Sequence, residues 1–315
     1  MNGREAYLAI VNPAAGGGRS RKMLGPALER LRAGGVAVDV AETQSAGDAT
    51  RIAREAYGLG RRKFIAVGGD GTSYEVVNGI FPEAGSGSDA GKAGEGARPT
   101  RCPTLGFLPL GTGNSFLRDF SDRGVEHAIE SLIAGRTRSC DVLRLRHRGG
   151  VIHYINLLSV GFPADVATLR ARRFSRQGEL GYIISIFLGL ARLHRRPFPV
   201  RVDGETEFDR RRCLFLTFNN SKFTGGTMMI APKAEVDSGL IEYVRWGAIG
   251  RLGLMRNLPG LYDGTHIEHP LAERKAVHRV EFDLDGAVDV MVDGEVLTLH
   301  CEALDVLPGA LDVVA

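Results

Sequence analysis

Three glycine-bearing turns near the start of the sequence carry residues that suit phosphate binding. They are Asn12–Arg19, Gly68–Thr72 and Leu110–Ser115, and each follows a short apolar run. Glycine lets the backbone approach a ligand closely, so that its N–H groups can reach phosphate oxygens. The N-terminus of a following helix adds positive partial charge at the same place. The pattern therefore predicts an anion-binding edge that is built mainly from backbone.

Side chains in these turns add further groups. Asp70 stands between glycines, where it could coordinate Mg²⁺, directly or through water, or take a proton from an attacking hydroxyl. It could also be a turn former or the N-cap of the helix that follows. Thr72 and Thr112 can donate hydroxyl hydrogen bonds, and Arg19 or Lys22 can supply a cation. We interpret Asp70 as functional, because three such turns occur together.

A second pair of acids lies near the end of the chain. Asp293 and Glu295 flank Gly294, between two runs of alternating hydrophobic residues. Taken alone, this pattern is typical of a tight hairpin turn and indicates no chemistry. Any catalytic role for these acids therefore depends on the rest of the sequence.

The elements that would position the first three turns alternate between strands and helices up to residue 139. The expected strands are Tyr7–Val11, Val36–Ala41, Phe64–Val67 and Thr104–Leu108, and the expected helices are Ser20–Arg32, Ala46–Tyr57, Tyr74–Phe81 and Val125–Ile133. This alternation indicates parallel βαβ units. Ligands of such sheets bind beyond the carboxyl ends of the strands, which is where all three turns would emerge.

From residue 140 onward, the pattern changes to short alternating segments. The expected strands are Asp141–Arg146, Val151–Ser159, Pro199–Val202, Arg212–Asn219, Leu240–Arg245, Arg279–Leu284, Val288–Val292 and Val296–Leu299. Two helical stretches, Gly181–His194 and Ile249–Leu258, interrupt them. Many short strands with turn signals predict an antiparallel sandwich or barrel. We therefore expect an α/β domain over 1–139 and a β-rich domain over 140–301.

Composition and charge exclude several classes of protein. The 315 residues are 43% hydrophobic and 24% charged, as expected of a globular protein with a sizeable core. The net charge of +3 is too small for a typical nucleic-acid binder, so no nucleic acid is expected as a partner. The four scattered cysteines favour free thiols over a disulfide or zinc framework. No apolar run approaches the roughly 20 residues of a membrane span, and we expect a cytoplasmic protein.

One tract differs from its surroundings. Residues 82–103 are rich in Gly, Ser and Ala, and they predict a mobile insertion because they cannot bury enough apolar area to become ordered.

The glycine turns contain neither GxxxxGK[ST] nor a GxGxxG motif in a dinucleotide-binding setting. Instead, Gly68–Thr72 followed by Glu75–Gly79 resembles the nucleotide-binding signature of the diacylglycerol kinase catalytic-domain superfamily, which includes bacterial lipid kinases, sphingosine kinases and ceramide kinases. Further matches occur in the expected order along nearly the whole chain. They are Asn12-Pro13 with Gly16, Thr43, Leu108–Asn114, Gly161-Phe162, Asn219-Asn220, Gly225-Gly226, Ala231-Pro232 with Ala234, and Asp293–Glu295.

This resemblance implies both a fold and an activity. The implied fold has an N-terminal α/β domain like that of NAD kinases and phosphofructokinases and a C-terminal antiparallel β-sandwich domain. The active site would lie between them, and residues 302–315 would return to the first domain. The implied activity is transfer of the γ-phosphoryl group of ATP to a lipid hydroxyl, with Mg²⁺.

The resemblance also implies roles for particular residues. Glu295 resembles the general base, Asp293 its neighbour, and Asp70 the acid that acts with Mg²⁺ at the transferring phosphate. The implied nucleotide-binding set is Asn12, Pro13, Gly16, Arg19, Thr43, Gly68, Gly69, Asp70, Gly71, Thr72, Glu75, Gly111, Thr112, Gly113 and Asn114.

The chain departs from the family's pattern at several positions. A lysine is usual after Gly16, but Gly17 stands there. Tyr74 replaces the usual Asn, and Ser115 replaces the usual Asp. At the family's magnesium site in the second domain, an Asp before a glycine is replaced by Ser238. The remaining candidates for that ion are Glu235, Asp237, Ser238 and the carbonyl of Leu240.

Two alternatives to a lipid kinase stay open. One is a kinase of the same fold that acts on NAD or a sugar phosphate. The other is a nucleotide- or lipid-binding regulatory protein in which the departures have weakened catalysis. For a lipid kinase, diacylglycerol is the first expectation for the substrate, and a sphingoid base or ceramide is the next.

A lipid substrate predicts peripheral contact with the inner face of the membrane. Six arginines flank an apolar helix over 182–193 and could meet anionic headgroups, namely Arg172, Arg173, Arg176, Arg192, Arg195 and Arg196. A core helix with solvated basic ends is the alternative interpretation. A homodimer is left open.

Overall fold

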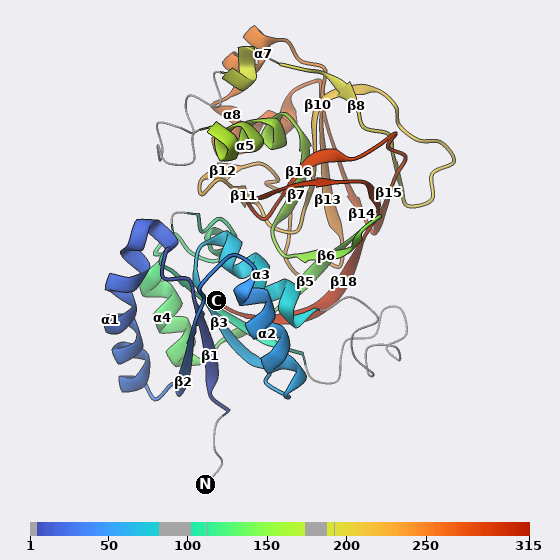
Figure 1. Cartoon of the computed structure of the whole chain (residues 1–315). Coiled ribbons are helices and arrows are strands. Elements are labelled where there is room, and N and C mark those ends of the chain that lie inside the picture. Colours follow the sequence, from blue (N-terminus) through green and yellow to red (C-terminus); the bar gives the residue numbers. More distant parts are fainter. Residues whose placement is uncertain (1–4, 82–101, 112, 174–187, 192) are drawn as a thin grey trace. The chain divides into compact units, whose positions relative to one another are not determined.

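The computed structural model describes residues 5–81, 102–111, 113–173, 188–191 and 193–315, without the side chains of 170–173. The chain divides into two compact units, which Figure 1 labels by element. Unit 1 comprises 1–142, 236–238 and 307–315, and unit 2 comprises 143–235 and 239–306. The predicted insertion at 82–103 lies almost wholly outside the described residues, as does most of the predicted helix Gly181–His194.

Unit 1 contains a parallel sheet. Its strands are β1 (Tyr7–Val11), β2 (Val38–Glu42), β3 (Lys63–Gly68) and β4 (Thr104–Pro109), in the order β2-β1-β3-β4. The end of β18 (Cys301–Val314) extends this sheet parallel to β4, with Asp312 opposite Thr104. Because β1, β3 and β4 run in the same direction, the turns after them emerge at one edge. The predicted parallel α/β fold is confirmed.

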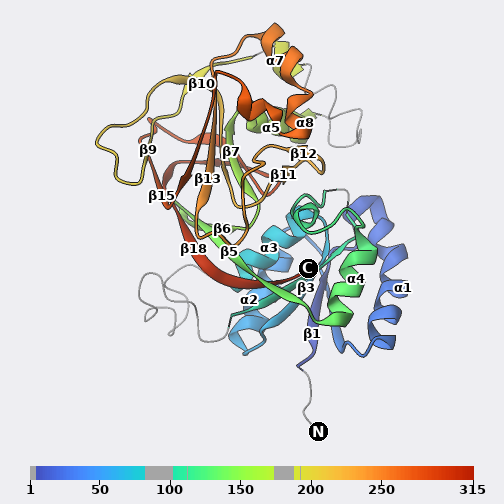
Figure 2. The same ribbon diagram turned by 180° about the vertical axis from the view of Figure 1, so that it is seen from behind.

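Helices cover both faces of this sheet. They are α1 (Arg19–Ala33), α2 (Asp48–Gly58), α3 (Asp70–Ile80) and α4 (Val125–Ala134), with 3-10 helices η1 (Ala15–Gly18) and η2 (Phe116–Asp119). Figures 1 and 2 show α1 and α4 on one face and α2 and α3 on the other. Ala27, Leu28 and Leu31 are buried on one side of α1, as helical periodicity requires. Gly79 lets α3 approach α2, because a Cβ atom there would lie 2.5 Å from the Ala53 Cβ.

Unit 2 is built mainly from antiparallel strands. One sheet has the order β14-β13-β10-β7-β16-β17, with β8 beside β10. Its strands are β7 (Leu157–Gly161), β8 (Arg196–Pro197), β10 (Arg212–Asn219), β13 (Ile241–Gly247), β14 (Ala272–Val277), β16 (Val288–Val292) and β17 (Glu295–Leu299). The other pairings join β5 (Thr137–His147) to β6 (Gly150–Tyr154), and β15 (Arg279–Phe282) to both β9 (Val200–Val202) and the start of β18. The predicted antiparallel, sandwich-like fold is confirmed.

The remaining elements of unit 2 are short. They are the hairpin β11 (Phe223–Thr224) and β12 (Met228–Met229), the helices α5 (Phe162–Arg173), α7 (Arg251–Asn257) and α8 (Gly260–Asp263), and the 3-10 helix η3 (Thr265–Glu268). A core cluster that includes Phe215, Trp246 and Leu254 packs α7 against the sheet. Among the helices in the described ranges, none combines the length and the hydrophobicity that crossing a bilayer requires.

One predicted strand was wrong. The sequence predicts a continuous strand over Val151–Ser159, but the structure has β6 and β7 with a break at Ile155 and Asn156. The break occurs because the N–H groups of these residues donate to a side-chain carboxylate from another part of unit 2 instead of to a neighbouring strand.

Candidate active site

The second and third glycine turns are joined directly in unit 1. The N–H of Gly111 donates to the carbonyl of Gly68 at 2.8 Å, and the N–H of Asp70 donates to the carbonyl of Gly113 at 3.0 Å. A Cβ atom at Gly69 would lie 2.7 Å from the Gly113 oxygen, and one at Gly111 would lie 2.6 Å from the Gly69 nitrogen. These positions therefore need glycine because the two backbones touch.

We predict that Gly111→Ala destabilises the protein by about 1–3 kcal/mol, the usual cost of overpacking. The new methyl group would force the second and third turns apart, so the affinity for ATP should fall as well. Urea unfolding and ATP titration measure the two effects. Gly25→Ala is the matched control, because a Cβ atom at Gly25 in α1 meets nothing within 4 Å. Equal stability of the two variants would contradict the close approach.

The first glycine turn lies against the third. A Cβ atom at Gly16 would be 2.7 Å from the carbonyl oxygen of Leu110. The Arg19 guanidinium donates to the carbonyl of Gly111 at 3.4 Å. Gly16, Gly17 and Gly18 have φ values of 62°, 64° and 89°, a left-handed conformation that strongly favours glycine. Successive N–H groups in such turns can form anion sites, so the three joined turns are a candidate phosphate-binding edge.

Asn12 makes hydrogen bonds at the start of the first turn. Its side-chain oxygen accepts the N–H of Ala14 at 3.0 Å, and its own N–H donates to the carbonyl of Val67 at the end of β3. Pro13 follows directly and is half-buried. Thr43 follows β2, and its N–H donates to the carbonyl of Val11 at 2.8 Å. Asn12 and Thr43 thus lie at the ends of the strands that carry the edge.

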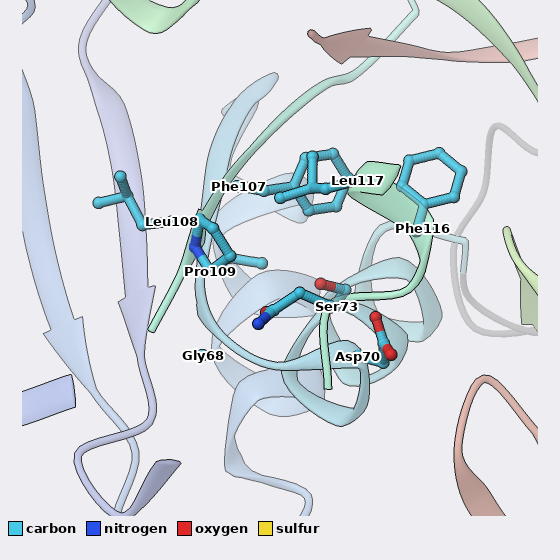
Figure 3. Close-up of a pocket in the computed structure, with 10 residues that line it drawn as sticks. Gly68, Asp70, Ser73, Phe107, Leu108, Pro109, Phe116 and Leu117 are labelled. Atoms are coloured by element: carbon cyan, nitrogen blue, oxygen red, sulfur yellow. The ribbon is translucent and has the colours of Figure 1, made fainter. Parts of the chain in front are cut away.

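Asp70 begins α3 and its carboxylate faces the third turn (Figure 3). Both carboxylate oxygens accept the N–H of Ser115, at 3.0 and 3.1 Å. Burial raises the pKa of Asp70, and hydrogen bonds from Ser115 and from the N–H of Phe116 oppose that rise. The serine that replaces the family's usual aspartate is therefore a donor to Asp70, where an aspartate would add a second negative charge.

A narrow cavity lies behind Asp70. Its volume is about 10 Å³, roughly the space of one water molecule. Asp70, Ser73, Asn114 and Phe116 are among its lining residues (Figure 3). The Asn114 side-chain amide donates to the carbonyl of Gly111 at 3.2 Å. A nucleotide cannot enter this cavity, so phosphates would have to lie on the outer N–H groups of the turns.

Two predicted nucleotide-binding residues, Thr72 and Glu75, make contacts within unit 1. Thr72 is buried beneath Gly68, where a Cβ atom would be 2.3 Å from the Thr72 hydroxyl oxygen. Glu75 accepts the N–H of Gly47 and the N–H of Ala49, both at 3.0 Å. These donors are at the N-terminus of α2, so Glu75 on α3 caps a neighbouring helix. Thr112 lies outside the described residues, and Gly71 lies in the first turn of α3.

We predict that Glu75→Gln lowers the free energy of unfolding by about 1 kcal/mol, the usual value of a helix cap. Glutamine keeps one carbonyl oxygen, so one of the two N–H groups loses its acceptor. Urea unfolding measures the loss. Unchanged stability together with weakened ATP binding would instead assign Glu75 to the nucleotide, as the family resemblance implies.

In unit 2, Asp293 and Gly294 form the two-residue turn between β16 and β17. Val292 pairs with Glu295, and the turn residues have φ values of 47° and 91°. Positive φ at both positions defines the tight hairpin turn that Asp-Gly favours. Glu295 is thereby fixed as the first residue of β17, with an exposed side chain. The hairpin predicted from the sequence is present.

The Asp293 carboxylate binds a separate segment. It accepts the N–H groups of Ile155, Asn156 and Leu157 at 3.1, 3.0 and 2.9 Å, while its own N–H donates to the carbonyl of Leu157. Asp293 is only 3% exposed. Burial, reinforced by the charge of Asp293, raises the pKa of the neighbouring Tyr154. Asp293 therefore positions the turn that carries Glu295, and its oxygens are directed at backbone.

Several buried polar side chains contact this segment, and the sequence did not predict that they come together. The Asn220 side-chain amide donates to the carbonyl of Ile155 at 2.9 Å, and the Ser221 hydroxyl contacts the Asn156 side-chain oxygen. The Asn219-Asn220 pair was noted only as a family match. The sequence feature that could have indicated these contacts is the run of polar residues at the end of the apolar strand β10.

The predicted magnesium ligands of the second domain lie in one segment, 235–240. The described residues include no group of three or more His, Cys, Asp or Glu side chains that could hold a metal. Asp237 instead pairs with Arg138 at 3.6 Å. Glu235, Asp237 and Ser238 are exposed, and Leu240 is half-buried. We therefore derive no chemical step through a metal held by these residues.

Comparisons with known proteins agree with both units. Residues 6–145 match the family described as Diacylglycerol kinase catalytic domain, and residues 156–315 match the YegS C-terminal NAD kinase beta sandwich-like domain. A diacylglycerol kinase from Mycobacterium tuberculosis is 27% identical over 308 residues, 97% of this chain and 93% of that protein. A probable lipid kinase, YegS-like, from Chromohalobacter salexigens is 30% identical over 321 residues, 100% of this chain and 91% of that protein.

Solved structures share the fold. A crystal structure of a diacylglycerol kinase from Bacillus anthracis has a TM-score of 0.68 at 19% identity and covers 100% of this chain and 98% of that chain. These structures share the parallel α/β unit and the antiparallel β unit described above. The chain belongs to the diacylglycerol kinase catalytic-domain family, whose members are named as lipid kinases.

Proposed function

We propose that this protein is an ATP-dependent lipid kinase that transfers the γ-phosphoryl group to a lipid hydroxyl, with diacylglycerol as the first candidate. The observation that carries the proposal is the joined set of glycine turns in unit 1, in which Gly16, Gly69 and Gly111 have no room for a Cβ atom. Backbone that is packed this tightly presents N–H groups in a fixed arrangement. The name of the Mycobacterium tuberculosis relative supports diacylglycerol over other lipids.

In the proposed reaction, the three turns bind the phosphates of ATP. Their N–H groups stabilise negative charge without having to reorganise, and Arg19 adds a cation at the same edge. Phosphoryl transfer depends mostly on positioning and electrostatic stabilisation, so few side chains need to react. Asp70 holds the third turn through Ser115 and so fixes the shape of this edge.

Glu295 is the proposed general base. Its carboxylate accepts the proton of the lipid hydroxyl as that oxygen bonds to the γ-phosphorus and the bond to the β-phosphate oxygen breaks, which releases ADP. An exposed carboxylate at the start of β17 can reach a substrate, whereas the buried Asp293 cannot. The tight turn and the Asp293 hydrogen bonds limit the positions that Glu295 can adopt.

We propose that ATP enters as its Mg²⁺ complex. Mg²⁺ in such enzymes is commonly held by substrate phosphates together with one or two carboxylates, rather than by a protein cage. The nucleotide would then bring the metal, so the proposal does not depend on Glu235 or Asp237 as metal ligands.

ATP consumption with and without lipid tests the proposal against its alternatives. A lipid kinase consumes ATP only when diacylglycerol, a sphingoid base or ceramide is supplied in mixed micelles. Consumption that depends on NAD or a sugar phosphate would indicate the other kinase class. Binding of ATP without consumption under any condition would indicate a regulatory protein and would refute the proposal.

A further inference from the structure

The outward face of α7 in unit 2 carries large apolar side chains in water. Leu252 is 82% exposed and Met255 is 47% exposed, although the same helix buries Leu254 on its inner side. The inner side packs on a core cluster that includes Trp246 and Ile249. A helix that is apolar on both sides is normally covered on both sides. Figures 1 and 2 show α7 at an edge of unit 2, close to α8.

Exposed apolar residues are concentrated in this part of unit 2. Tyr262 on α8 is 51% exposed, and Leu271 after η3 is 42% exposed. Together with Leu252 and Met255, they are the exposed large hydrophobic residues of unit 2 among the described residues. Those of unit 1 come from four separate segments and are Met23, Val40, Leu59 and Ile133. Exposed apolar residues that come from one stretch of chain, here 252–271, favour an interaction surface, whereas singly scattered ones need no explanation.

Arginines lie close to Leu252 and on the same helix. Arg251 and Arg256 lie on α7, while Arg195 and Arg212 line a surface hollow of about 640 Å³ against the start of that helix. Within the described ranges, none of these four guanidinium groups has a carboxylate partner; Arg251 donates to the carbonyl of Ala191 at 2.7 Å.

Several other arginines of unit 2 have carboxylate partners. Arg196 pairs with Asp165, Arg211 with Asp209, and Arg274 with Glu242. Of the acids close to these residues in the sequence, Glu242 pairs with Arg274, Glu273 pairs with Arg211, and Asp263 accepts a hydrogen bond from Thr265. The surface is therefore both apolar and cationic.

We propose that this surface docks on an anionic lipid bilayer. The α7 surface is defined by Leu252, Met255, Tyr262 and Leu271 with Arg195, Arg212, Arg251 and Arg256. Apolar side chains of an interfacial helix enter the boundary between headgroups and acyl chains, while arginines meet anionic headgroups. A symmetric contact with a second copy would place these arginines close to one another, so it fits the charges less well.

The proposal extends the proposed lipid-kinase function, because it names the surface from which the enzyme would reach its substrate. The α7 surface also differs from the basic segment around residues 172–196 that the sequence predicts to meet the membrane. That segment lies mostly outside the described residues, and its Arg196 is held by Asp165 at 2.6 and 2.8 Å. Of that segment, only Arg195 belongs to the α7 surface.

Sedimentation with vesicles tests the proposal. The full chain should bind phosphatidylcholine vesicles that contain phosphatidylglycerol, bind pure phosphatidylcholine weakly, and lose affinity as salt increases. Leu252→Asp with Met255→Asp should weaken binding by roughly tenfold or more, because two apolar side chains no longer enter the interface. Arg251→Glu with Arg256→Glu should weaken it by about fivefold or more per residue.

Two controls match these variants. Leu59→Asp changes an apolar residue of unit 1 that is 88% exposed, and Arg148→Glu reverses an exposed charge of unit 2. Both should bind vesicles as the wild type does. Unchanged vesicle binding in both α7 variants overturns the proposal. So does a wild-type dimer that these variants dissociate while vesicle binding persists, because the surface then belongs to a second copy.

The outcome is distinguishable from failure of the kinase proposal. Transfer to a short-chain diacylglycerol in neutral micelles reports the chemistry without an anionic bilayer. If phosphoryl transfer occurs but the α7 variants bind vesicles as the wild type does, only the proposed surface is refuted. Vesicle binding that these variants abolish, without transfer to any lipid, supports the surface and refutes the kinase function.

Discussion

Glu295→Gln is expected to lower kcat for phosphoryl transfer by roughly 10²-fold or more, the usual scale for loss of a general base. Glutamine has nearly the same shape as glutamate, but its amide cannot accept the proton of the attacking hydroxyl. The free energy of unfolding should not change, because Glu295 is exposed at the start of β17. Steady-state transfer from ATP to diacylglycerol, with urea unfolding in parallel, measures both.

Glu302→Gln is the matched control for this variant. Glu302 is an exposed glutamate on another strand, β18, and it should keep wild-type turnover. If Glu295→Gln also keeps wild-type turnover, Glu295 is not the base. A lower affinity for ATP with unchanged kcat would equally contradict the assignment, since a base acts in the transition state.

Asp70→Asn should reduce turnover on a similar scale for a different reason. Asparagine keeps one oxygen for three donors, namely the N–H and hydroxyl of Ser115 and the N–H of Phe116, so the third turn would be held less firmly. Because the edge is preorganised for developing charge, a loss of roughly 10²-fold is expected. Near-wild-type activity in this variant would show that catalysis does not depend on Asp70 fixing the third turn.

Asp293→Ala is expected to cause the largest loss of stability, about 3 kcal/mol or more. It removes the acceptor of three consecutive N–H groups at the start of β7, and a buried donor without a partner costs about 1–3 kcal/mol. The left-handed φ of 47° is also unfavourable for alanine. Urea unfolding measures the loss, and Asp293→Asn should lose less because it keeps one oxygen and tolerates that φ.

Asp203→Ala supplies a control with the same local chemistry. Asp203 also has a positive φ, precedes a glycine and accepts two backbone N–H groups, those of His278 and Arg279. It is exposed, so water can replace the lost acceptor and the cost should be smaller. Equal losses at Asp203 and Asp293 would show that burial of the Asp293 carboxylate contributes nothing to stability.

The sequence predicted unit 1 well because its signals are local. The strands Tyr7–Val11 and Thr104–Pro109 are short apolar runs, and each glycine turn directly follows one. The meeting of the turns also followed, since parallel strands place their carboxyl ends at one edge. The hydrogen bonds of Glu75 could not be predicted, because its partners, the N–H groups of Gly47 and Ala49, are far away in the sequence.

Unit 2 was harder to predict because long-range contacts decide its local structure. The break between β6 and β7 is set by Asp293, well over a hundred residues later in the chain. Strand β14 (Ala272–Val277) was missed because three of its residues, Arg274, Lys275 and Ala276, are exposed at the sheet edge and give no apolar run. Helix α5 was missed because charged residues dominate its C-terminal half.

The most direct test of the central claim follows the labelled γ-phosphate of ATP into product. The purified protein, ATP and Mg²⁺ are incubated with diacylglycerol in mixed micelles, with sphingoid base, ceramide and NAD in parallel reactions. We predict that label appears in phosphatidic acid, with an equal amount of ADP, and that Glu295→Gln abolishes it. Label in NADP⁺ alone, or in no lipid while the protein binds ATP, would contradict the assignment of this protein as a lipid kinase.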